Sequence, residues 1–308
     1  MTMQRTAADP LAMRPATSGG AAALFATSTI IWSSTWLAIT FQLGSVPPEA
    51  SVAYRFALAA LVLGAWCLVT RRSLHYPPRV HVMLAAQGAL MFGVNYVWVY
   101  KAEQHLTSGL VAVLFSTLVF MSLVGTRIAF ATPITARAVL GATLGVGGVA
   151  LLFAPQLTTS DARGDVVLGV ALSLGATFLC TLGNLVSMKM QREQLPILPT
   201  TAWGMAYGAI VAALLATVAG VQWAFDWSVR YVGSLVYLAC FGSVIAFGAY
   251  FMLLKRVGAG PSSYVAVATP VLAMVLSSAL EGYRWTAAGV IGIALAVVGN
   301  VLVLRRAA

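Results

Sequence analysis

Ten apolar runs of about twenty residues follow one another along the 308-residue chain, separated by short connections. An α-helix of that length crosses the roughly 30 Å hydrocarbon core of a bilayer, because each residue adds about 1.5 Å. The sequence therefore predicts an all-α integral membrane protein with ten transmembrane helices. The predicted spans are residues 21–43, 49–70, 80–100, 107–125, 136–153, 166–188, 200–221, 231–254, 261–280 and 285–304.

The composition leaves no room for a soluble domain beside these spans. Hydrophobic residues make up 60% of the chain and charged residues 8%, against about 45–50% and about 25% in soluble domains. Turn-forming prolines mark the connections, as at Pro47–Pro48 and Pro77–Pro78. Residues 1–20 are rich in Ala, Thr and Pro and predict a short disordered arm. We therefore expect the function of this chain to reside inside the bilayer.

The basic residues indicate how the chain is oriented. Most of its 18 lysines and arginines fall on the side that holds both predicted termini, and basic loops face the cytoplasm in membrane proteins. We expect cytoplasmic termini and interpret the net charge of +10 as a topology signal, with no nucleic-acid partner. That side carries Arg5, Arg14, Arg71, Arg72, Arg79, Arg127, Arg137, Lys189, Arg192, Lys255, Arg256, Arg305 and Arg306, and the other side carries Lys101, Arg163, Arg230 and Arg284.

The two halves of the sequence resemble each other. An offset of 154 residues aligns Tyr96 with Tyr250, and an offset of 151 aligns Gly141 with Gly292. A repeat of five spans must insert upside down relative to its copy, because five is odd. We therefore predict two inverted five-helix repeats, residues 21–155 and 164–306, around a central cavity. Chance matching of small apolar residues is the alternative.

Several short motifs carry a family resemblance. They are Trp32-Ser33-Ser34-Thr35, Arg55-Phe56-Ala57-Leu58-Ala59-Ala60-Leu61, Pro270 followed by Glu281, Trp285-Thr286, and a glycine run from Gly289 to Gly299. In these motifs the chain resembles the drug/metabolite transporter superfamily, in its ten-helix EamA-type branch. The resemblance implies a carrier of small organic solutes in the bacterial inner membrane, most often an exporter of amino acids or other metabolites.

The chain departs from that family pattern in its first half. Ser116 stands where a proline is expected, Arg127 where a glutamate is expected, and Ser33 where glycine usually follows tryptophan. These departures leave the subfamily and the substrate open.

Candidate solute contacts lie at the middle of the spans. Pro270 lacks a backbone N–H and frees the carbonyl of Ala266, whereas Ser116 and Thr117 supply hydroxyls at the matching depth. A packing kink and hydrogen bonds within the helix are the alternatives. Helical spacing adds Trp32, Trp36, Gln87, Asn95, Trp98, Thr181 and Asn184, with Phe241 and Tyr264 as weaker candidates. Interhelical bonding is the alternative for the polar residues, and core packing is the alternative for the aromatic ones.

Arg55 is the ionisable residue that lies clearly inside a predicted span. Such residues are candidates for function by default, and Arg55 could bind a solute carboxylate. Snorkelling to the outer surface, or pairing with Glu49 or Glu103, is the alternative. The acidic residues stand at span ends, so we expect facilitated exchange or weakly coupled export rather than proton coupling through a buried glutamate.

Other functions have less support in the sequence. The three cysteines and three histidines show no metal-ligand spacing, and there is no HExxH motif or pair of carboxylates. We therefore predict no metal, no cofactor and no enzyme. The leading function is export of a small solute, for which a neutral amino acid fits best. A drug or toxic-compound efflux carrier, an intramembrane enzyme and a channel are the alternatives, and a monomer is favoured.

Overall fold

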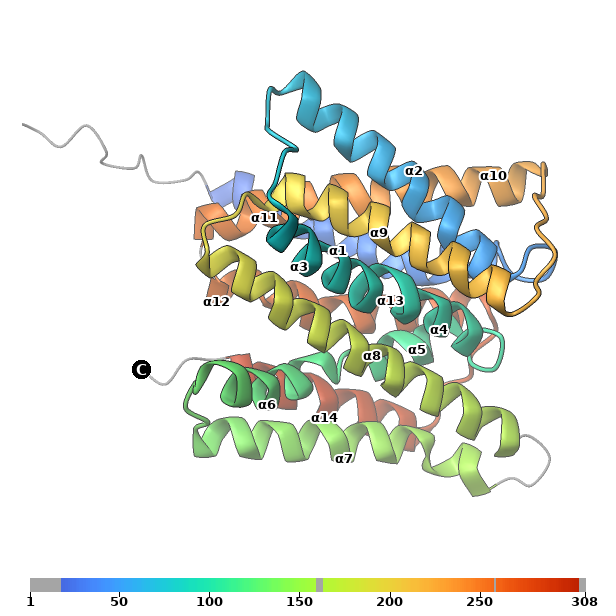
Figure 1. Cartoon of the computed structure of the whole chain (residues 1–308). Helices are drawn as coiled ribbons and strands as arrows, with labels where there is room; N and C mark the ends of the chain where they lie inside the picture. The colour runs from blue at the N-terminus through green and yellow to red at the C-terminus, as the bar shows by residue number, and fades with distance from the viewer. Residues whose placement is uncertain (1–17, 159–162, 258, 305–308) are drawn as a thin grey trace, which may run out of the picture.

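The computed structural model describes residues 18–158, 163–257 and 259–304, and these residues form helices and no strands (Figure 1). The elements are α1 (Ser18–Thr40), α2 (Pro48–Val69), α3 (Pro78–Gln87), η1 (Gly88–Gly93), α4 (Val94–Ala102), α5 (Ser108–Phe115), α6 (Leu118–Phe130), α7 (Ala136–Thr158), α8 (Arg163–Arg192), α9 (Ile197–Val218), α10 (Val229–Val236), η2 (Tyr237–Ile245), α11 (Ala246–Val257), α12 (Ala259–Ser262), α13 (Tyr264–Leu280) and α14 (Ala287–Leu304). Most of the predicted arm, residues 1–17, lies outside the described residues.

The all-helical membrane architecture is confirmed. Within the described residues, nine helices are long and apolar enough to cross a membrane. The ninth predicted run is the exception, because it is divided into α12 and a 17-residue α13. At about 1.5 Å per residue, α13 is roughly 25 Å long, shorter than the hydrocarbon core. The arrangement of ten spans as two repeats stays a prediction.

The connections follow the turn chemistry of the sequence. Pro48 and Pro78 stand in the first turns of α2 and α3, where a missing N–H costs no helical hydrogen bond. Ala131 ends α6 in the left-handed conformation, with φ 53°. In Figure 1, α1 begins and α14 ends on the same side of the bundle.

Besides the ninth run, three further helical runs are interrupted within the described residues. The third contains the π-helical segment η1, and the eighth contains the π-helical segment η2. The fourth is broken at Ser116 and Thr117, between α5 and α6. In η2 the Ser243 hydroxyl donates to the carbonyl of Leu238, five residues earlier, at 3.0 Å. π-helical turns often occur at functional sites, so these interruptions direct attention to the helices around them.

Glycines bring α7 and α14 into backbone contact at one edge of the bundle (Figure 1). A Cβ atom at Gly141 would lie 2.6 Å from the carbonyl oxygen of Gly299, and one at Gly292 would lie 2.5 Å from that of Gly148. Side chains at these positions would force the helices apart. The pattern is the small-residue packing expected between membrane helices.

Candidate functional site

Arg55 is buried in the bundle, with 2% of its surface exposed. Its Nη1 lies 3.5 Å from the hydroxyl of Tyr100, which donates to Gln42 Oε1 at 2.7 Å. The guanidinium carbon lies 4.6 Å from the centre of the Tyr96 ring, a cation–π contact. We call Gln42, Arg55, Tyr96 and Tyr100 the arginine cluster.

Two of the expected alternatives for Arg55, snorkelling and pairing with Glu49, do not describe this arrangement. Its side chain lies against the Tyr100 hydroxyl and the rings of Phe56 and Tyr96 instead of reaching the surface. Pairing of Arg55 with Glu49 is not observed, because Glu49 forms an ion pair with Lys101 at 2.6 Å.

Several polar atoms in and beside the arginine cluster are buried without a hydrogen-bond partner. They are Arg55 Nε, Gln42 Nε2 and both carboxyl oxygens of Glu103. Such groups are rare in native proteins, because each forfeits its hydrogen bond to water. The cluster therefore offers unused donors to an incoming group.

Glu103 follows the last residue of α4 and is 7% exposed. Burial raises the pKa of its carboxyl group well above the ordinary value; the charge of Glu281 adds to the rise and that of Arg55 opposes it. Glu281 itself accepts hydrogen bonds from the backbone N–H and the hydroxyl of Ser108. Glu103 is therefore more readily protonated than a surface glutamate.

Glu103→Gln tests this protonation. Because the pKa of Glu103 is raised in the folded protein, the free energy of unfolding of the parent falls as the pH rises from the ordinary glutamate range through the raised pKa. We expect the variant to melt at least about 2 °C above the parent at pH 8, with the gap shrinking towards pH 4, as a shift of ~1 kcal/mol would give. Glu193→Gln, at an exposed position, serves as the control for differential scanning fluorimetry. A variant that melts below the parent at pH 8 would contradict the assignment.

Trp32 forms a second cluster next to the first. Its indole N–H donates to the carbonyl of Gly242 at 3.2 Å, and its ring centre lies 5.2 Å from that of Phe247 and 5.3 Å from that of Tyr250. We call Trp32, Gly242, Phe247 and Tyr250 the tryptophan cluster. A Cβ atom at Gly242 would lie 2.7 Å from Thr35 Cγ2 and 3.8 Å from Arg55 Nη2. Gly242, inside η2, therefore brings the two clusters together.

Other predicted residues of α1 and α13 lie against neighbouring helices. The Trp36 ring centre is 5.2 Å from that of Phe115. The Ser33 hydroxyl donates to the carbonyl of Thr269 at 3.0 Å, next to the buried Pro270. Two of the predicted candidates, Trp32 and Pro270, are thus linked through α1.

The predicted amides connect helices to one another. Gln87 Nε2 donates to Ser187 Oγ at 2.6 Å, and Asn95 Nδ2 donates to the carbonyl of Ala176 at 2.8 Å. Both bonds end on α8, so they fit the interhelical alternative. Gln87 Oε1 and Asn95 Oδ1 are buried without a partner.

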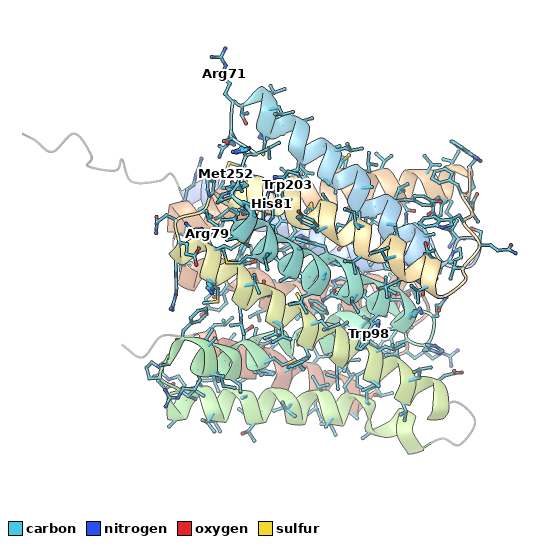
Figure 2. All side chains as sticks on the ribbon, viewed as in Figure 1. Arg71, Arg79, His81, Trp98, Trp203 and Met252 are labelled. Atoms are coloured by element: carbon cyan, nitrogen blue, oxygen red, sulfur yellow. The ribbon has the colours of Figure 1, made fainter. Side chains whose placement is uncertain are left out.

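The remaining candidates make other contacts. The hydroxyls of Ser116, Thr117 and Thr181 donate to carbonyls of their own helices. Asn184 Nδ2 is 3.9 Å from the sulfur of Cys180. Tyr264 is half-buried, whereas Trp98 and Phe241 are exposed. Figure 2 shows Trp98 beside α8.

Sequence reasoning missed five residues of these clusters: Gln42, Tyr96, Tyr100, Gly242 and Tyr250. A signal for one pair was present, because the 154-residue offset aligns Tyr96 with Tyr250. One of these tyrosines faces Arg55 and the other faces Trp32. No group of three or more metal-ligating side chains occurs among the residues that the structure describes.

The chain matches a known protein family over most of its length. The model of the EamA-like transporter family matches residues 20–154 and again residues 167–305. The "Uncharacterized inner membrane transporter YedA" of Escherichia coli K12 is 28% identical over 277 residues, which cover 87% of each chain. The "Uncharacterized transporter YoaV" of Bacillus subtilis is 22% identical, over 80% of this chain and 83% of the relative. "Protein PagO" of Salmonella typhimurium is 22% identical over 91% of each.

A solved structure shares the fold. It is described only as the crystal structure of a protein, and it superposes with a TM-score of 0.67 at 18% identity, covering 93% of this chain and 96% of the other.

Proposed function

Since the chain belongs to the EamA-like transporter family, we propose that this membrane transporter is a secondary carrier that exports small organic solutes, with neutral amino acids as the leading class. The solute enters between the helices and is released on the other side by alternating access. A drug or toxic-compound efflux carrier of the same fold is the alternative.

The observation that carries the proposal is the buried, incompletely bonded guanidinium of Arg55. A buried charge is costly unless it is paired, and the described residues place no carboxylate within 4.0 Å of it. A solute carboxylate would pair with the charge of the Arg55 guanidinium and accept its free hydrogen bond, with Gln42 Nε2 as a further donor. The tryptophan cluster lies next to this position and supplies an apolar and aromatic wall.

The duplicated architecture belongs to the same proposal. It is supported by the double match of the family model and by the packing of α2 on α9 and α7 on α14. The 151-residue offset relates Gly141 to Gly292 and Gly148 to Gly299, and it therefore exchanges the two contacts Gly141–Gly299 and Gly148–Gly292. Two inverted repeats that rock about the clusters would provide alternating access. The basic loops favour cytoplasmic termini.

The direct test is counterflow in proteoliposomes. Unlabelled amino acid inside the vesicles should accelerate entry of the labelled amino acid if the protein is a carrier, whereas a pore shows no such acceleration. A panel of neutral, acidic and basic amino acids identifies the solute class. Failure with every amino acid, together with counterflow of a lipophilic drug, would favour the efflux alternative.

A second measurement tests coupling. We expect exchange to proceed at a similar rate with and without a proton gradient, because the acidic residues lie at the ends of the spans. A strict requirement for the gradient would overturn facilitated exchange. Loss of that requirement in Glu103→Gln would then place the proton on this carboxyl group.

A further inference from the structure

An apolar groove lies between α2 and α9, with a volume of about 410 Å³. Small residues form its walls, including Ala57, Ala60 and Gly64 on α2 and Ala202 and Ala206 on α9. The two helices diverge towards the end of α2 in Figure 1. The groove is separate from the clusters described above, because its α2 residues lie about 120° or more around the helix from Arg55.

The surroundings of the groove are those of a surface that faces lipid. Leu61 and Ile210, which line it, are 72% and 53% exposed. Apolar side chains so exposed in a membrane helix contact acyl chains. The groove is therefore filled from the hydrocarbon region of the bilayer.

The size of the groove limits its occupant. A helix is about 10 Å across with its side chains, so 410 Å³ holds only about one turn of it. A helix from a second copy of this chain would therefore place only about one turn in the groove. A single acyl chain is thinner and fits the space.

One end of the groove is closed by a fixed polar and aromatic group. Trp203 and Leu74 line it, and the Trp203 indole N–H donates to the Leu74 carbonyl at 2.8 Å. The ring of His81 lies 4.8 Å from that of Trp203, and its Nδ1 is 3.0 Å from the hydroxyl of Tyr207. Aromatic residues of this kind gather at the level of the lipid headgroups.

Two arginines stand beyond this end. Arg71 and Arg72 directly follow α2, are exposed, and have no carboxylate within 4.0 Å among the described residues. Figure 2 shows Arg71 projecting from the end of α2, above Trp203 and His81. Each basic residue next to a membrane helix is attracted to anionic lipid headgroups by about 1 kcal/mol, and the arginine fork matches the phosphate geometry.

We propose that this groove is a binding site for an anionic phospholipid. One acyl chain lies between α2 and α9, and the phosphate is held by Arg71 and Arg72. The apolar walls select a lipid chain, and the two arginines select negative charge.

Native mass spectrometry of the full-length protein in detergent tests this site. Added phosphatidylglycerol should be retained in preference to phosphatidylcholine with the same chains. Gly64→Leu adds a side chain to the groove wall, and its Cβ atom would meet nothing within 4 Å. We expect it to weaken phosphatidylglycerol binding about tenfold. Gly147→Leu is the matched control, since Gly147 on α7 is also in open space.

A second variant separates the two halves of the proposal. Arg71→Ala with Arg72→Ala should abolish the preference for phosphatidylglycerol over phosphatidylcholine, a change of about tenfold or more. Equal retention of both lipids by the parent, or unchanged phosphatidylglycerol binding by Gly64→Leu, would overturn the site. A dimer that Gly64→Leu dissociates would overturn it in favour of a second copy. None of these measurements depends on the transported solute.

Discussion

Arg55→Leu is expected to reduce counterflow of a carboxylate-bearing solute at least about tenfold while leaving expression intact. A hydrogen bond to a charged group contributes about 1.5–3 kcal/mol, and ~1.4 kcal/mol corresponds to a factor of ten in binding. The bond from Tyr100 to Gln42 does not involve Arg55, so these partners stay joined in the variant. Radiolabelled counterflow in proteoliposomes, at several solute concentrations, measures the loss.

Two further variants make the arginine result specific. Arg55→Lys keeps the charge but loses the planar donor pair, so we expect intermediate transport. Arg127→Leu removes an arginine from an exposed position on α6 and should transport as the parent does. Unchanged transport by Arg55→Leu would remove Arg55 from the solute site.

Gly141→Val should destabilise the protein severely. A Cβ atom there would lie 2.6 Å from the Gly299 carbonyl oxygen and 2.9 Å from Leu302 Cβ, and the closest of these neighbours is backbone. Overpacking of this kind costs typically about 1–3 kcal/mol, which lowers the melting temperature by about 2–4 °C per kcal/mol in a chain of this size. Thermal unfolding in detergent and the yield of folded protein measure the effect.

Gly147→Val is the matched control for this substitution. Gly147 lies on the same helix, and a Cβ atom there meets nothing within 4 Å. Valine has a higher helix propensity than glycine, so the control should melt at or above the parent temperature. Equal melting of the two variants would mean that α7 and α14 do not pack through their glycines.

The helices could be predicted from sequence because hydropathy and length alone determine which segments cross a bilayer. The interruptions could not, since nothing in the apolar run from Val80 to Tyr100 marks where the backbone widens into η1. Pro270 pointed to a kink in α13 but Ser116 and Thr117 did not predict the break between α5 and α6. Sequence-based prediction fails here for the local backbone geometry. Small and β-branched residues are compatible with both a regular and an interrupted helix, so their presence does not show which one forms.

The candidate site was predicted in part. Arg55 and Trp32 stood out because charge and tryptophan are unusual at their depth. Their partners come from other helices, and Gly242 has no side chain to signal its role. Gln87 and Asn95, which were solute-site candidates, donate hydrogen bonds to groups on α8, as the interhelical alternative expects. Only tertiary packing distinguishes such a bonded amide from one that awaits a ligand.

The wide turn at η2 has a consequence for divergence within the family. A π-helical turn holds one residue more than an α-helical turn, and one residue corresponds to a rotation of about 100°. A relative that has lost that residue by deletion would present a different face of its helix after this point. Phe247 and Tyr250 would turn away from Trp32, although every residue of α11 was retained. A one-residue deletion between positions 237 and 245 would therefore change the aromatic surroundings of Trp32 without any substitution in the aromatic residues themselves.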